Sequence, residues 1–205
     1  MNYNKLADPA LLDKTSKSLK NLGYEVVVVK NKAEALEQIK SSVPKGASVM
    51  NGSSVTLEQI GYQDYIKNGN HGWNDLHAKI YAESDNVKRA ALRKESVSSE
   101  YYLGSVHALV SNGEFIVASN TGSQLPHLVF TSANLILAVS TKKIVENMSD
   151  AMSRLEDHIM PLEDKHMQEL YKVNTAFRKL LVFKSENPGG GRKIKFILIQ
   201  EDLGF

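Results

Sequence analysis

The polar residues best placed for chemistry lie at two points where a β-strand is expected to pass into a helix. The first point carries, in order along the chain, Asn51, Gly52, Ser53, Ser54, Thr56 and Glu58. Backbone N–H groups at a helix amino terminus are unpaired, and the helix dipole favours an anion there. A glycine lets a ligand approach the backbone closely, and hydroxyl groups can donate hydrogen bonds. This pattern indicates a pocket for a negatively charged ligand.

A second turn of the same kind follows residues 106–119. It carries Asn120, Thr121, Gly122 and Ser123. Open α/β sheets bind ligands in the crevice outside the carboxyl ends of their strands, so the two turns are expected to face one crevice. Neither turn matches a Walker A motif or a dinucleotide fingerprint. The sequence therefore predicts neither a nucleoside triphosphate site nor a Rossmann-type cofactor site.

Each of these residues also has a purely structural interpretation. Ser54 can cap the following helix, and Gly52 can simply turn the chain. Glu58 stabilises the first turn of a helix whatever else it does. Glu114, which follows the Asn112-Gly113 pair, is the candidate catalytic residue, but to act as a base it must point into the crevice.

Metal and redox chemistry receive little support from the residue types. The six histidines show no metal-ligand spacing, so no metal site is predicted. His107 and His127 lie beside the two expected strand ends, although a structural role is favoured for both. The chain has no cysteine, which excludes disulfides, thiolate catalysis and iron–sulfur ligation by its own residues. No cofactor is predicted.

Length and composition favour an ordinary globular protein. A chain of 205 residues predicts a single domain spanning residues 1–205, and 42% apolar and 23% charged residues are typical values. The formal net charge of +2 is spread over both halves, which argues against a nucleic-acid partner. Neither a signal sequence nor an apolar run of membrane-spanning length is found, so a cytoplasmic protein without a membrane segment is expected.

Strands and helices alternate along the elements that hold the two turns. Strands are predicted over residues 24–29, 47–50, 101–104, 135–139 and 194–199. Helices are predicted to begin at Asp8-Pro9, at Asn31 and after Ser54, and to cover residues 87–96 and 147–158. Such alternation is typical of βαβ units, and continuous apolar strands are typical of sheets buried on both faces. An α/β fold with a mostly parallel sheet and helices on both faces is therefore predicted.

Residues 106–119 interrupt this alternation. Their Asn112-Gly113 pair between apolar residues is a strong β-hairpin signal, so an antiparallel hairpin inserted in the parallel sheet is predicted. Residues 67–80 and 184–193 read as irregular segments. The single tryptophan, Trp73, is expected near the mouth of the pocket.

Several of these segments together resemble the LUD-domain family, named for lactate utilisation. VMNGSSVTLEQIG resembles the family's glycine–serine–threonine–leucine–glutamate segment, and RKIKFILIQEDLGF resembles its carboxyl-terminal signature, which closes on Glu201 to Phe205. GSVHALVSNGEFIVASNTGSQLPHLVF and LAVSTKKIVENMSDAMSRLEDHIMPL are similar to the segments between them. The resemblance covers the chain from about residue 10 to residue 205.

The resemblance implies a fold like those of ribose-5-phosphate isomerase, glucosamine-6-phosphate deaminase and the CoA transferases. It also implies a role in using lactate or a related organic acid, alongside iron–sulfur partner proteins. The positions that match the family's two polar motifs are Asn51, Gly52, Ser53, Thr56, Glu58, Asn120, Gly122 and Ser123. Relatives with this ending often carry a cysteine cluster before the last strand, whereas residues 173–193 contain none. A redox role that depends on such a cluster is therefore absent here.

Three functions remain open from the sequence. The favoured one is a component of organic-acid utilisation that binds a small anionic metabolite at the two turns. A stand-alone isomerase or CoA-transferase-type enzyme, acting on a phosphosugar or an acyl-CoA, would need a carboxylate and a lysine together in the crevice. A non-catalytic scaffold for iron–sulfur partner proteins is the third. A homo-oligomer, with a second copy completing the crevice, is compatible with all three.

Overall fold

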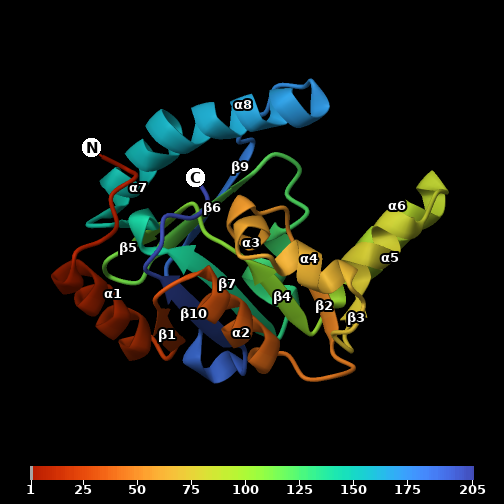
Figure 1. Ribbon diagram of the computed structural model, residues 1–205, viewed down its shortest axis with the longest axis horizontal. Coiled ribbons are helices and arrows are strands. Elements are labelled where there is room, and N and C mark those ends of the chain that lie inside the picture. The colour runs from red at the N-terminus through yellow and green to blue at the C-terminus, as the bar shows by residue number, and fades with distance from the viewer. Residues whose placement is uncertain (1) are drawn as a thin grey trace.

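The computed structural model describes residues 2–205 (Figure 1). Its α-helices are α1 (Pro9–Asn21), α2 (Lys32–Ser42), α3 (Val55–Gln59), α4 (Tyr62–Lys67), α5 (Leu76–Ala82), α6 (Asn86–Glu95), α7 (Met148–Arg154) and α8 (Met160–Tyr171). Its strands are β1 (Glu25–Val29), β2 (Ser48–Asn51), β3 (Asn74–Asp75), β4 (Tyr101–Gly104), β5 (Ala108–Val110), β6 (Phe115–Ser119), β7 (Asn134–Ser140), β8 (Ile144–Val145), β9 (Lys179–Phe183) and β10 (Lys193–Ile199). Short 3-10 or π-helical segments are η1 (Ser96–Ser98), η2 (His127–Thr131), η3 (Thr141–Lys143), η4 (Leu155–Ile159) and η5 (Pro188–Gly190).

The larger sheet has the strand order β1-β10-β7-β4-β2-β3, and its neighbouring strands run parallel. Its longest pairing joins β10 to β7, whose partners run from Lys193 and Asn134 to Ile199 and Ser140. These two strands are almost continuously apolar, as expected for strands covered on both faces. The mostly parallel α/β fold predicted from the sequence is confirmed.

The hairpin at Asn112-Gly113 forms as predicted between β5 and β6, with Gly113 at a φ of 96°. The expectation that it would be inserted in the parallel sheet is wrong. A second sheet has the strand order β8-β5-β6-β9, in which β8 runs parallel to β5 and β9 antiparallel to β6. The hairpin therefore finds its edge partners in β8 and in β9, a strand that the sequence reading had not recognised.

The two sheets and the helices stack in layers. Helices α2, α3 and α4 cover one face of the larger sheet, where the buried strand residues include Val49, Leu103, Ile136 and Ile197. The other face packs against α1 and against the second sheet, through residues that include Leu19, Leu109, Phe115, Leu135, Leu137 and Phe196. The far side of the second sheet is covered by α7 and η4 through Ala151, Leu155 and Ile159. One face of the parallel sheet is thus shared between a helix and a sheet.

Local side-chain chemistry fixes the starts of the helices that the sequence predicted. Asp8 Oδ1 accepts a hydrogen bond from Leu11 N at 2.9 Å, and Asn31 Oδ1 accepts one from Glu34 N at 3.0 Å. These contacts satisfy backbone donors that a helix leaves unpaired at its amino terminus. The predicted caps at Asp8 and Asn31 are confirmed.

Residues 67–80 are more ordered than the sequence suggested. They contain β3 and the start of α5, whose first turn is capped by Asp75 Oδ1 through Ala78 N at 3.0 Å. Trp73 is buried in the core below α2, and its Nε1 donates to the Val43 carbonyl oxygen at 3.1 Å, so its expected place at the pocket mouth is wrong. Helix α6 instead extends away from the rest of the molecule (Figure 1), and none of its described residues is buried.

The central position of β7 gives a test of this packing. Leu137 is fully buried, and Leu137→Ala is expected to lower the free energy of unfolding by about 2–5 kcal/mol, because it removes apolar contacts and leaves a cavity. Urea denaturation measures the change. Val87→Ala is the control, since Val87 on α6 is 80% exposed and its loss should change stability by no more than about 0.5 kcal/mol. Equal losses in the two variants would contradict the layer arrangement.

Candidate functional site

The carboxyl ends of β2, β4 and β7, which are neighbours in the larger sheet, open into one cavity. Strand β2 ends at Asn51, β4 ends at Gly104, and β7 leads into η3, which ends at Lys143. The cavity has a volume of about 570 Å³, which is within the usual range for small-molecule sites. Its position agrees with the general rule that parallel α/β sheets bind ligands beyond the carboxyl ends of their strands.

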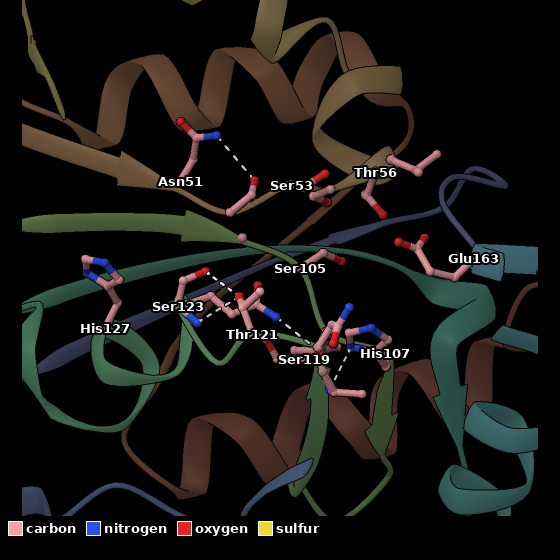
Figure 2. A pocket seen from close by; sticks show the side chains of 18 of the residues that line it. Asn51, Ser53, Thr56, Ser105, His107, Ser119, Thr121, Ser123, His127 and Glu163 are labelled. Carbon is pink, nitrogen blue, oxygen red and sulfur yellow. Dashed lines mark hydrogen bonds between the residues drawn. The ribbon is translucent and has the colours of Figure 1, made fainter. Parts of the chain in front are cut away.

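Both polar turns lie on this cavity, as the sequence predicted. Figure 2 shows their labelled side chains around a common space. The residues of the two turns that line the cavity are Asn51, Gly52, Ser53, Ser54, Thr56, Asn120, Thr121 and Ser123. Because the second turn follows β6, the cavity lies where the larger sheet and the second sheet meet.

Three of the predicted site residues do not line the cavity. Gly122 has a φ of 85°, and a Cβ atom there would lie 2.7 Å from Lys179 Cδ, so this glycine shapes the turn. Glu58 is exposed on α3. Glu114 stands before β6, whereas the cavity lies beyond its last residue, Ser119, about 17 Å away at the rise of a strand. Glu114 therefore does not line the crevice in which it is predicted to act as a base.

The helix dipole and the backbone donors expected to attract an anion contribute less than the sequence suggests. Helix α3 spans only Val55–Gln59, which is too short for a substantial helix dipole. Ser54 Oγ accepts from Leu57 N at 3.3 Å and so serves as the helix cap. In the second turn, Gly122 N already donates to Ser119 Oγ at 2.9 Å. The backbone donors of the turns are thus partly used within the protein.

Arg93 and the buried Lys143 are basic residues that line the cavity, and the sequence did not single out either. Lys143 has the more unusual surroundings. Its buried Nζ donates to Thr56 Oγ1 at 2.9 Å, to Ser105 Oγ at 3.2 Å and to the Val106 carbonyl oxygen at 3.3 Å. Within residues 2–205, Lys143 forms no ion pair. Burial, with further contributions from Arg154 and Lys142, lowers the pKa of Lys143 to about 7. All its hydrogen-bond partners are neutral.

Other charged groups near Lys143 are arranged differently. Arg154 is fully buried, and its Nη2 donates to the Phe205 carbonyl oxygen at 2.9 Å. Lys142 pairs with Asp202 at 2.5 Å. Glu163 reaches the cavity from α8 (Figure 2), and burial raises the pKa of its carboxyl group. The cavity is therefore lined by the Lys143 amine and the Glu163 carboxyl group, and the pKa of each is shifted in the direction that favours its neutral form.

His107 contributes a neutral donor to the same cavity. Its Nδ1 accepts a hydrogen bond from Ala118 N at 3.2 Å, so the ring proton resides on Nε2. Burial, together with the charges of Lys143 and Arg154, lowers the pKa of His107 to about 3. The imidazole therefore stays neutral at physiological pH and can donate through Nε2 to an oxygen atom in the cavity.

His127 supports the cavity wall. Its Nδ1 lies 3.2 Å from Ser99 Oγ and 3.0 Å from Ser132 Oγ, and burial lowers its pKa to about 4. The ring stacks on Tyr102 with a centroid distance of 4.8 Å. These contacts give His127 the structural role that the sequence favoured.

Tyr102 and Gln124 connect the two polar turns beneath Gly52. Tyr102 Oη donates to Gln124 Oε1 at 3.3 Å, and Gln124 Nε2 donates to the Ala118 carbonyl oxygen at 3.1 Å. A Cβ atom on residue 52 would lie 2.5 Å from Tyr102 Oη and 2.8 Å from Gln124 Oε1. Close approach of the first turn to Tyr102 and Gln124 therefore requires glycine at position 52. From the sequence, this glycine is explained by the close approach of a ligand instead.

The helices that follow β3 also contribute to the cavity lining. His77 and Tyr81 of α5 pack with tilted rings at a centroid distance of 4.4 Å, and Tyr81 is 70% exposed. Arg93 of α6 also lines the cavity. An aromatic pair and an exposed guanidinium group are thus part of the cavity lining.

The described residues contain no cluster of three or more histidine, aspartate or glutamate side chains arranged to hold a metal ion. In residues 2–205, no helix combines the length and the apolar character needed to cross a membrane. The side chains that line the cavity include the Lys143 amine, the Glu163 carboxyl group, the Arg93 guanidinium group, imidazole rings and several hydroxyl groups.

These features define an α/β protein with a polar small-molecule crevice at the carboxyl ends of its central parallel strands. The family model of the LUD domain matches residues 12–179, and the chain belongs to the LUD-domain family. A solved DUF162 family protein from Deinococcus radiodurans is similar in structure, with a TM-score of 0.57 and 12% sequence identity over 95% of this chain and 99% of that one. At this identity the likeness concerns the fold. No match was found among the curated proteins.

The lowered pKa of Lys143 predicts a dependence of stability on pH. From about pH 7 to 10.5 the unfolded chain binds more protons at Lys143 than the folded chain does, so the free energy of unfolding rises with pH in this window. Lys143→Met removes this rise, which is at most about 1.4 kcal/mol per pH unit. Denaturant titrations of both proteins at pH 7 and pH 9 measure the difference.

Lys88→Met is the matched control for this measurement, because Lys88 is exposed on α6. The stability difference between this variant and the wild type should not change between the two pH values. A difference that stayed equally constant for Lys143→Met would show that the Lys143 amine titrates like a solvated lysine.

Proposed function

We propose that this LUD-domain protein binds an organic acid in the cavity between the two polar turns, as a component of lactate or related organic-acid utilisation. The observation that carries the proposal is the environment of Lys143. A buried cation without a counter-ion is costly, and a ligand carboxylate would supply the missing negative charge. Membership of the LUD-domain family supports an organic acid as the source of that carboxylate.

Neutral donors around Lys143 suit the remaining oxygen atoms of such a ligand. Thr56 and Ser105 carry hydroxyl groups beside the amine, and His107 offers Nε2–H. Hydroxyl and imidazole donors bind a carboxylate or a hydroxyl group without adding a charge that must itself be neutralised. The donor set therefore fits a carboxylate carrying a second oxygen function.

The cavity is larger than a three-carbon acid requires. A volume of about 570 Å³ is in the range that holds drug-sized ligands. Tyr81, His77 and Arg93 of α5 and α6 add an aromatic pair and a guanidinium group to its lining. An acid with a longer or aromatic body, or a second substrate, fits a cavity of this size and lining.

A second candidate function is an enzyme of the isomerase or CoA-transferase type. It is favoured by one observation, that Lys143 and Glu163 line the same cavity. In such a reaction Glu163 would transfer the proton and Lys143 would stabilise the developing negative charge. A phosphosugar or an acyl-CoA is the corresponding substrate.

A thermal-shift screen separates these functions. The purified protein is heated with lactate, pyruvate, glycolate, phenylpyruvate, phosphosugars or CoA esters, each at the highest practical concentration. An acid present at a hundred times its dissociation constant adds about 2.7 kcal/mol, which raises Tm by several degrees in a protein of this size. A shift with organic acids supports the first function, and a shift confined to phosphosugars or CoA esters supports the second. The absence of any shift would contradict both.

Gly52 provides a test of where the ligand binds. Gly52→Ala is expected to weaken binding of the acid that gives the largest shift by tenfold or more, equal to about 1.4 kcal/mol, because the new methyl group displaces Tyr102 and Gln124. Isothermal titration calorimetry measures the affinity. Gly190→Ala is the matched control, since its Cβ would meet only Asn187 Cβ at 3.9 Å. Equal affinities in the two variants would place the ligand elsewhere.

A further inference from the structure

Two adjacent lysines at the end of β7 are buried to the same degree but have different surroundings. Lys142 is 7% exposed and Lys143 is 5% exposed. Lys142 forms an ion pair with Asp202 and does not line the cavity. Lys143 has only neutral partners and does line it. Lys142 thus has a structural partner outside the cavity, whereas Lys143 lines the cavity without an ion-pair partner in the described chain.

The position of the Lys143 amine is closely defined. Two hydroxyl oxygens and one carbonyl oxygen accept its hydrogen bonds at 2.9 to 3.3 Å. On another side the backbone of Gly204 packs so closely that a Cβ there would lie 2.9 Å from Nζ. An amine held at one place beside a cavity is preorganised to react with a ligand bound there.

We propose that Lys143 is the nucleophile of a covalent site, whose amine adds to the carbonyl group of an oxo acid bound in the cavity and forms an imine. This inference rests on the organic-acid binding proposed above. It narrows the ligand to an acid that carries an aldehyde or ketone group. Lactate itself, which has no carbonyl group besides its carboxylate, would bind without reacting.

The reaction balances without an oxidant or a reductant. The Nζ lone pair attacks the carbonyl carbon, a C–N bond forms, and the π electrons move to the oxygen atom, which takes up a proton. The nitrogen loses a proton and the carbinolamine results. Protonation of its hydroxyl group then allows water to leave as the nitrogen lone pair completes the C=N bond, and the resulting iminium ion gives the proton back to form the imine. One water is released for each imine formed.

The cavity contains groups for each of these proton transfers. Thr56 and Ser105 hydroxyl groups touch Nζ and can relay the proton that the nitrogen loses. Glu163 lines the cavity from α8 and can protonate the departing hydroxyl group. The hydroxyl groups of Ser53 and Ser123, which line the same cavity, remain available to donate to the ligand carboxylate.

Protonation states favour the same reaction. With a pKa of about 7, a large fraction of the Lys143 amine is neutral near pH 7, whereas an ordinary lysine is almost wholly protonated. The charged neighbours that maintain this low pKa, after burial itself, are Arg154 and Lys142. Burial raises the pKa of the Glu163 carboxyl group, which favours its protonated form relative to a solvated glutamate.

Reductive trapping tests the proposal on the full chain. The protein is incubated at pH 7 with pyruvate, glyoxylate, 2-oxoglutarate or phenylpyruvate and with cyanoborohydride, which converts an imine into a stable secondary amine. Peptide mapping by mass spectrometry then locates the modified lysine. At least one acid should label Lys143 tenfold or more above Lys142 and the exposed Lys88, and prior unfolding in urea should abolish the preference. Labelling of Lys143 no greater than that of Lys88 with every acid would overturn the proposal.

Two variants and one unreactive ligand distinguish this inference from the function on which it rests. Lys143→Arg keeps the positive charge but lacks a nucleophilic amine, so it should lose trapping, while Lys142→Arg should retain trapping at Lys143. A thermal shift with lactate tests acid binding alone. A lactate shift without trapping by any oxo acid would overturn the covalent site and leave the binding function standing. Neither shift nor trapping would overturn both.

Discussion

The burial of an amine at the carboxyl end of β7 is the constraint around which the site is built. The parallel sheet brings the ends of β2, β4 and β7 together, and the second sheet closes the space beside them. Lys143 enters this space at the end of η3, and its hydrogen bonds go to hydroxyl and carbonyl oxygens from the first turn and from the residues after β4. With neutral acceptors alone, the ammonium form is poorly compensated, so the site needs either a ligand anion or a neutral amine.

The parts of the fold and site that could be predicted from the sequence depend on local chemistry. The two turns, the caps at Asp8 and Asn31, and the hairpin at Asn112-Gly113 each follow from a few adjacent residues whose conformational preferences agree. The parallel sheet follows from the alternation of apolar strands with helices. Parallel strands align their carboxyl ends at one edge of the sheet. Knowing the fold class was therefore enough to predict that the two turns lie on one crevice.

What the sequence did not show depends on partners distant in the chain. Strand β9 follows an irregular segment and becomes a strand because β6 offers it an edge, which left the hairpin misplaced and the second sheet unrecognised. Lys143 follows an apolar strand and precedes another, and its chemistry is visible only when Thr56 and Ser105 stand beside it. Glu114 is the opposite case. Its residue type suits a base and it lies near a turn, but it stands before β6, whereas the cavity lies at the carboxyl end of that strand.

The orientation of a ligand would decide whether it pairs with Lys143 as an anion or reacts with it, because only the neutral form of the amine is nucleophilic. A carboxylate placed directly against Nζ favours the ammonium form, raises the pKa of the amine and so suppresses nucleophilic attack. A ligand whose carboxylate is held by the hydroxyl groups of the turns, with its carbonyl at Nζ, leaves the amine neutral and reactive. Arg154 and Lys142 oppose the ammonium form in either case. On the proposed function, the same cavity would hold one acid as a bound anion and another as a covalent adduct, according to which oxygen function faces Lys143.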